Sequence, residues 1–159
     1  MFTLKDIPTF FWSFFLVLPL VSIIHQLGHT FFVLIFGGKG SLDLGRGRVL
    51  FSIGFFKLRK LYFLDSFCDY RDLKVDNKLT HALVYLGGTF FNLLTVFILN
   101  TLIAEGILPP NLFFYQFAYF SVYFVFFALL PVHYGKGHPS DGKALIELIK
   151  YGTKNDLID

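Results

Sequence analysis

A nearly uninterrupted run of apolar residues from Thr9 to Phe36 limits what this chain can fold into more than any other feature. A lipid bilayer has a hydrocarbon core of about 30 Å, which an α-helix crosses in roughly 20 residues. The run is long enough to cross it. It is also far longer than the apolar part of a secretory signal peptide, and no small-residue cleavage site follows it. We therefore expect a membrane-spanning helix over residues 9–36.

Two further stretches, residues 81–104 and 113–130, are of the same apolar kind. A chain of 159 residues is too short to bury three helices that are apolar on every side, which argues against a soluble protein. The composition agrees, because only 16% of the residues are charged, against roughly a quarter in an average globular domain. The sequence predicts a membrane α-helical fold, with three transmembrane helices in a single domain, residues 1–159, embedded in a lipid bilayer.

The basic residues report orientation rather than binding to nucleic acid, although the net charge is +3. Most of them lie in the polar segment 37–78, and the turn around Pro109 and Pro110 has none. Others follow Pro131: Lys136, Lys143, Lys150 and Lys154. By the positive-inside rule, the polar segment and the C-terminus are cytoplasmic, and the N-terminus and the turn lie outside. We expect a multi-pass protein of the cell membrane.

The segment 37–78 and the tail carry the remaining structure. Residues 48–56 and 58–64 are rich in β-branched and aromatic side chains, with Gly54 near the break, which predicts a β-hairpin. Its aromatic content fits either a cytosolic hairpin or one that lies against the membrane surface or partly enters it. From Ser140 to Tyr151, apolar residues at helical spacing predict a short amphipathic cytosolic helix.

Two histidines lie in the first apolar span, where polar side chains are energetically expensive. His25 and His29 are four residues apart, so they share a helix face and can converge on a tetrahedral zinc ion. Catalytic zinc sites usually take three protein ligands and leave a fourth position for water. A pair of histidines that hydrogen-bond to other helices explains the same spacing without a metal.

The third ligand is expected shortly after the third span. Asp141, within Pro139–Gly142, offers a carboxylate there, although an aspartate at this position also suits the N-cap of the tail helix. His133 and His138 lie just before it and are alternatives, either as the third ligand or as residues that orient a ligand.

Gly88 and Asn92 place small and polar groups inside the second span. Glycine permits close approach of helices. The amide of Asn92 has four hydrogen-bonding sites to satisfy, so it either ties helices together or holds the backbone of a substrate.

In this order, the three motifs resemble those of the site-2 protease family of intramembrane zinc metalloproteases, and the resemblance covers most of the chain. The HExxH motif of that family is matched by residues 25–29, and its GPxxN-like motif by residues 88–92, with Thr89 in place of proline. Its PxDG-type motif, which supplies the acidic zinc ligand, is matched by residues 139–142. The family also commonly has a β-hairpin after the first core helix.

The resemblance implies a minimal three-helix core with Zn²⁺ held by His25, His29 and Asp141. It implies that the substrate is a transmembrane or membrane-inserted peptide, held extended by Asn92, by Gly88 beside it, and by the hairpin strands.

Gln26 is the departure from the family pattern, because it stands at the position of the HExxH glutamate. That glutamate takes a proton from water and passes it to the leaving amine, which an amide cannot do. Zinc binding is expected to persist, while hydrolysis falls by about two to four orders of magnitude. Two interpretations follow: a metalloprotease in an inactive Glu-to-Gln form, or a natural pseudoprotease that binds a membrane peptide or partner helix. A metal transporter would need a continuous polar path, for which the spans hold too few polar residues.

Overall fold

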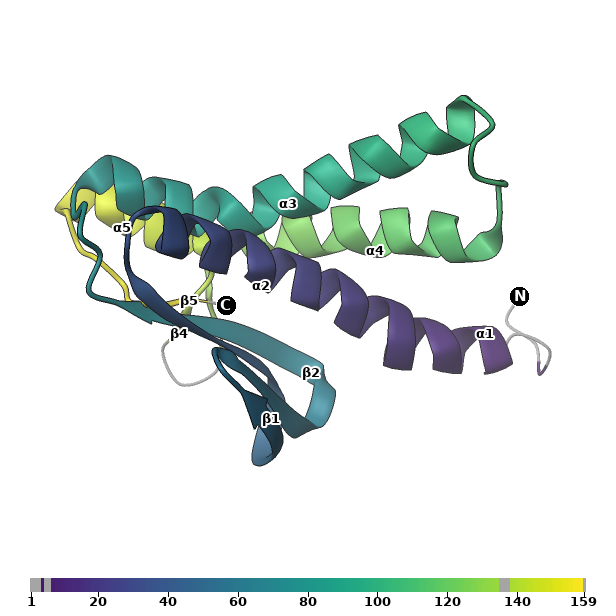
Figure 1. Ribbon diagram of the computed structural model, residues 1–159, viewed down its shortest axis with the longest axis horizontal. Helices are drawn as coiled ribbons and strands as arrows, with labels where there is room; N and C mark the ends of the chain where they lie inside the picture. The colour runs from purple at the N-terminus through teal and green to yellow at the C-terminus, as the bar shows by residue number, and fades with distance from the viewer. Residues whose placement is uncertain (1–3, 5–6, 135–137, 159) are drawn as a thin grey trace.

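The computed structural model describes residues 4, 7–134 and 138–158. Within these residues, three helices are long and apolar enough to cross a membrane: Ile7–Ile35, Lys78–Ala104 and Leu112–Leu129. Every boundary lies within three residues of the range predicted from the sequence. The three helices form one bundle, with the short helix α5 (Asp141–Tyr151) at the end opposite the N-terminus (Figure 1).

The first span is one continuous helix with a widened turn. It consists of α1 (Ile7–Trp12), the π-helical turn η2 (Ser13–Val17) and α2 (Leu18–Ile35). Pro19 lies in the first turn of α2 and has no N–H to give to the turn before it, so the regular hydrogen-bond ladder is interrupted there. The widened turn therefore coincides with the position where the proline breaks the ladder.

The other two spans, α3 (Lys78–Ala104) and α4 (Leu112–Leu129), are antiparallel neighbours joined at the end of the bundle away from α5 (Figure 1). Each begins at an asparagine cap. The side chain of Asn77 accepts from the N–H of Thr80, and that of Asn111 accepts from the N–H of Phe114. Such caps satisfy N–H groups that the first turn of a helix leaves unpaired.

A long antiparallel hairpin, β1 (Lys39–Ile53) and β2 (Phe56–Arg71), follows the first span. Its pairing begins at Lys39 opposite Arg71, so both strands are longer than the predicted 48–56 and 58–64. The hairpin lies beside α2 (Figure 1), and the ring of Phe63 lies 4.8 Å from that of Phe15, centroid to centroid. The hairpin thus runs back along the first span instead of standing clear of it.

Helix α5 begins where α4 has just ended, after two short paired strands, β3 (His133–Tyr134) and β4 (His138–Pro139). Ser140 caps α5, because its Oγ accepts from the N–H of Lys143 at 3.2 Å. The interpretation of Asp141 as the N-cap is therefore wrong, and its carboxylate is available for another role. Gly142 lies against the backbone of Leu129, where a side chain would not fit.

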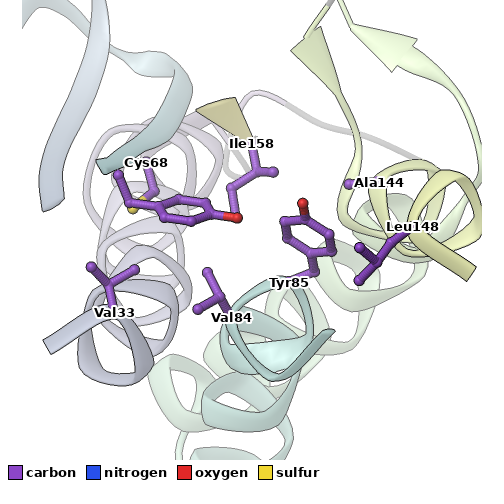
Figure 2. Close-up of a cluster of buried hydrophobic side chains, with 8 residues drawn as sticks. Val33, Cys68, Val84, Tyr85, Ala144, Leu148 and Ile158 are labelled. Carbon is purple, nitrogen blue, oxygen red and sulfur yellow. The ribbon is translucent and has the colours of Figure 1, made fainter. Parts of the chain in front are cut away.

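A cluster of buried side chains fastens α5, α3, α2 and the sheet together at this end of the bundle (Figure 2). Its members are Val33, Cys68, Tyr70, Val84, Tyr85, Ala144, Leu148 and Ile158. Ile158 belongs to the short strand β5 (Leu157–Ile158), which pairs with β2 at Cys68 and Asp69. The hydroxyl of Tyr85 also accepts from the N–H of Asn155 at 2.8 Å. The tail that follows α5 is thus bound to the rest of the molecule.

Candidate metal centre

The structure brings together the three ligands predicted from the sequence. His25 and His29 lie on one face of α2, and Asp141 is the first residue of α5. All three side chains are completely buried. His25 Nε2 lies 3.0 Å from Asp141 Oδ2, and His29 Nε2 lies 3.4 Å from Asp141 Oδ1. One donor atom from each residue falls within 4.8 Å of the others.

These distances suit a single zinc ion. Two atoms bound to one zinc at about 2.1 Å in a tetrahedral arrangement lie about 3.4 Å apart. Two contacts between the histidines and the aspartate, at 3.0 Å and 3.4 Å, are close to this separation. Asp141 supplies the oxygen donor of this set, and zinc accepts carboxylate ligands.

The surroundings of His29 leave two buried polar atoms facing each other. Its Nδ1 lies 2.7 Å from the carbonyl oxygen of Val84, which can only accept, so Nδ1 carries a proton and, in the neutral ring, Nε2 presents a lone pair. That lone pair faces Asp141 Oδ1, and neither atom has a hydrogen-bond partner in the described part of the chain. Two electron-rich atoms so close, away from water, repel each other unless a cation lies between them.

Helix α3 reaches the histidines because it has glycines where it crosses α2. A side chain on Gly28 or Gly87 would collide with the backbone of the other helix. A Cβ on Gly88 would collide with the Nε2 atoms of both His25 and His29. Gly88 therefore leaves room at the point where the two imidazoles converge. The substrate-binding role predicted for it stays a prediction.

Asn92 lies behind His25. Its Nδ2 is 3.3 Å from His25 Nδ1, and the side chain is completely buried. On another side, the His25 ring packs against Phe124 of α4, with the centroids 4.8 Å apart. The structure thus places the amide predicted to hold substrate in direct contact with a ligand histidine.

Gln26 is part of a buried hydrogen-bond chain that leads away from the histidines. Its Nε2 donates to Ser66 Oγ at 3.0 Å, and Ser22 Oγ lies 2.6 Å from the same oxygen. Among the residues described, Gln26 Oε1 has no hydrogen-bond partner. Ser66 belongs to β2, so the hairpin contacts the position of the general base.

A groove of about 380 Å³ opens beside this chain, between β2, α2 and α4. Ser22 and Ser66 line it, and so does Phe124, whose ring separates it from His25. The groove is otherwise mostly aromatic and apolar, apart from an ion pair in which Arg46 Nη2 lies 2.5 Å from Asp65 Oδ2. Two of its lining residues contact the residues around the candidate metal centre, because Ser66 accepts from Gln26 and the Phe124 ring packs against His25.

Other histidines considered from the sequence stand apart from this centre. His133 is half exposed and lies 3.6 Å from Glu147, and the ring of His138 packs against Phe67. Neither belongs to the cluster of possible metal ligands found among the described residues. His81, in the first turn of α3, is buried and hydrogen-bonded to Tyr70 and Asp76.

Sequence reasoning missed two contributors to the site, the carbonyl of Val84 and the hydroxyl of Ser66. A backbone carbonyl has no sequence signature. A serine in a hairpin shows its role only once the hairpin is seen to pack on α2.

One protein of known sequence is closely similar over the whole length. The chain is 54% identical over 157 residues to the "Uncharacterized membrane protein YwmF" of Bacillus subtilis (strain 168), and the alignment covers 99% of both chains. No protein-family profile and no solved structure matches the sequence. The relative's name and the three apolar helices agree on a protein embedded in a lipid bilayer.

Proposed function

This chain belongs to the same family as the Bacillus subtilis membrane protein YwmF, and we propose that it is a zinc-binding membrane protein of the intramembrane metalloprotease type. The single observation that carries the proposal is the buried pair of His29 Nε2 and Asp141 Oδ1, 3.4 Å apart and without hydrogen-bond partners among the described residues, which a metal cation between the two atoms would stabilise. Two imidazoles and one carboxylate are the donor set of a catalytic zinc site, with one position left open.

Each ligand has a defined task at the site. His25, His29 and Asp141 would hold the ion, and the Val84 carbonyl orients His29 as outer-shell acceptors orient metal-binding histidines. When bound, zinc supplies Lewis-acid chemistry: it polarises a carbonyl group and makes water more acidic. Gln26 Oε1, which has no hydrogen-bond partner among the described residues, could accept a hydrogen bond from water but cannot take up its proton, so we expect peptide hydrolysis by this chain to be slow.

The groove is the proposed seat of a membrane-inserted peptide. One edge of β2 pairs with β1, and the other edge pairs with β5 at Cys68 and Asp69. Along residues 62–66, this second edge pairs with no strand within the described ranges. An extended peptide added to this edge would run for about 17 Å, between Ser66 on one side and Phe124 on the other. A peptide must be extended to be cut, because the hydrogen-bonded peptide bond of a helix is poorly accessible to a nucleophile.

The site lies inside the membrane, near its cytoplasmic face. Helix α4 has 18 residues and spans about 27 Å, close to the thickness of the hydrocarbon core. Phe124, which contacts His25, is five residues, or about 7.5 Å, from the end of α4 at Leu129. The positive charges on the hairpin and tail assign that end to the cytoplasm. The Arg46–Asp65 ion pair indicates that water enters the groove, since a dry pair at this depth would be costly.

A second candidate function, a pseudoprotease that binds a membrane peptide or partner helix without cutting it, is favoured by one observation. Gln26 Nε2 donates to Ser66 Oγ, so the amide is built into the hydrogen-bond chain that joins α2 to the hairpin. In that case the same groove and the same metal serve binding alone.

Metal analysis tests the proposal. The protein purified in detergent is expected to hold one zinc per chain, and His25→Ala and Asp141→Ala to lose it. His133→Ala is the matched control, because it removes a histidine outside the centre and should leave the zinc content unchanged. Equal zinc content in all four proteins would overturn the assignment.

Hydrolysis is tested by restoring the general base. Gln26→Glu is expected to cut membrane-inserted peptides at a rate about two to four orders of magnitude above that of the unchanged chain, and a chelator should stop it. Zinc binding without cleavage of any peptide in a broad panel would decide for the pseudoprotease.

A further inference from the structure

The two ligand histidines are held by unlike partners. His29 Nδ1 is bonded to the carbonyl of Val84, which permits only the tautomer with the proton on Nδ1. His25 Nδ1 lies 3.3 Å from the side-chain amide of Asn92, which has a donor at one atom and an acceptor at the other. His29 is therefore ready for a metal at all times, whereas the state of His25 depends on how the amide is turned.

In the arrangement that the structure shows, Asn92 Nδ2 faces His25 Nδ1 and donates to it. The proton of the neutral ring then lies on Nε2, which donates to Asp141 Oδ2 at 3.0 Å. A nitrogen that carries a proton cannot bind zinc. Asn92 Oδ1 is meanwhile buried with no hydrogen-bond partner among residues that are described, which is an energetically costly state.

Rotation of the Asn92 amide by half a turn changes both the position of the His25 proton and the bonding of Asn92 Oδ1. Asn92 Oδ1 then accepts from a proton on His25 Nδ1, so the buried oxygen gains a partner. His25 Nε2 then presents a lone pair toward Asp141, as His29 Nε2 already does, and all three donors are free for a cation.

We propose that Asn92 is a positioning residue that selects the tautomer of His25: one orientation of its amide holds the His25–Asp141 hydrogen bond, and the other prepares His25 to bind a divalent cation. Uptake of the metal includes rotation of this amide and relocation of one proton from Nε2 to Nδ1 of His25. This proposal rests on the metal centre of the proposed function, but not on peptide hydrolysis.

Three variants separate the roles of the amide. In Asn92→Asp the carboxylate can only accept from His25, so it favours the proton on Nδ1 even without metal. Asn92→Leu keeps a similar volume and removes the hydrogen bond. Thr95→Val is the matched control, because Thr95 lies on the same helix and its hydroxyl donates to the carbonyl of Phe91, four residues earlier in that helix.

The experiment uses the full chain in detergent, with its histidines labelled with ¹⁵N, and two-bond ¹H–¹⁵N spectra that distinguish the two tautomers. Signals are assigned from His25→Gln and His29→Gln samples. Without metal, His25 is expected in the Nε2–H form and His29 in the Nδ1–H form, and zinc should convert only His25. In Asn92→Asp, His25 is expected in the Nδ1–H form before zinc is added.

Zinc affinity, measured by competition with a chromophoric chelator, supplies the second readout. Asn92→Leu is expected to bind zinc about 10–100-fold more weakly, and Thr95→Val as tightly as the unchanged chain. A His25 that already carries its proton on Nδ1 without metal would overturn the proposal, and so would an Asn92→Leu variant with unchanged affinity. If the unchanged chain takes up no zinc, the proposed function fails, while the metal-free spectra of the unchanged chain and Asn92→Asp still decide whether Asn92 sets the tautomer.

Discussion

Replacing Gly88 by alanine should destroy metal binding while leaving the fold largely intact. The added Cβ would lie 2.5 Å from His29 Nε2, and closer still to His25 Nε2, whereas ordinary van der Waals contact begins at 3.4 Å. The imidazole of His29 would have to retreat by about 0.9 Å. Metal–ligand distances tolerate errors of only about 0.2 Å, so at least one ligand is lost.

The expected cost to zinc affinity is more than about 100-fold, because changes that merely reorient a ligand already cost 10–100-fold. The cost to the metal-free fold is much smaller. Overpacking destabilises by about 1–3 kcal/mol, and the better helix propensity of alanine returns about 1 kcal/mol. Chelator competition measures the first effect, and thermal unfolding of the metal-free protein in detergent measures the second.

Gly40→Ala is the matched control, because its added Cβ would come no closer than an ordinary 3.4 Å to its nearest neighbour, Val33 Cγ1. It should bind zinc normally. A Gly88→Ala variant with unchanged zinc affinity would refute the placement of the ion between the two Nε2 atoms.

Three further predictions concern other parts of the molecule. Burial raises the pKa of Cys68 from 9.0 to about 12. The contribution of the neutral thiol to the free energy of unfolding is therefore complete below pH 9 and declines as the pH rises toward 12. Cys68→Ala should reduce the slope of unfolding free energy against pH between pH 9 and 12, and an unchanged slope would contradict this prediction. Lys154 Nζ lies 2.6 Å from Asp76 and lowers the pKa of that carboxyl. Lys154→Met should therefore raise the pKa of Asp76 and speed amide hydrogen exchange in residues 152–158. Exchange as slow as before would show that this ion pair does not hold the C-terminal segment in place. Ile107→Cys, exposed in the α3–α4 connection, should react with an impermeant maleimide on intact cells, and reaction only after lysis would reverse the proposed orientation.

The spans and the two ligand histidines were predictable because both depend on local patterns. A long apolar run is sufficient to identify each helix, and His25 and His29 share a face through helical spacing alone. Asp141 was predicted from its place after the third span and from the family motif, because no local rule links it to His25, 116 residues earlier in the chain.

The packing of the hairpin was not predictable from the sequence. Alternating apolar residues indicate a strand but not what it packs against, so the contact of Phe63 with Phe15 and the bond of Ser66 to Gln26 emerge only from the three-dimensional structure. The cap of α5 shows the same limit on a small scale. Ser140 and Asp141 both suit the N-cap, and the chain uses the serine, which leaves the carboxylate free.

The position of Asp141 in α5 also sets when the centre can exist during biosynthesis. His25 and Asp141 are 116 residues apart, and a ribosome adding about 5–20 residues per second needs roughly 6 to 23 s to make that stretch. Throughout that time the nascent chain holds two histidines in the membrane without their carboxylate. The three side chains therefore come together only when α5 docks against the end of α4, and an ion that needs all three would enter a protein whose three spans have already been made.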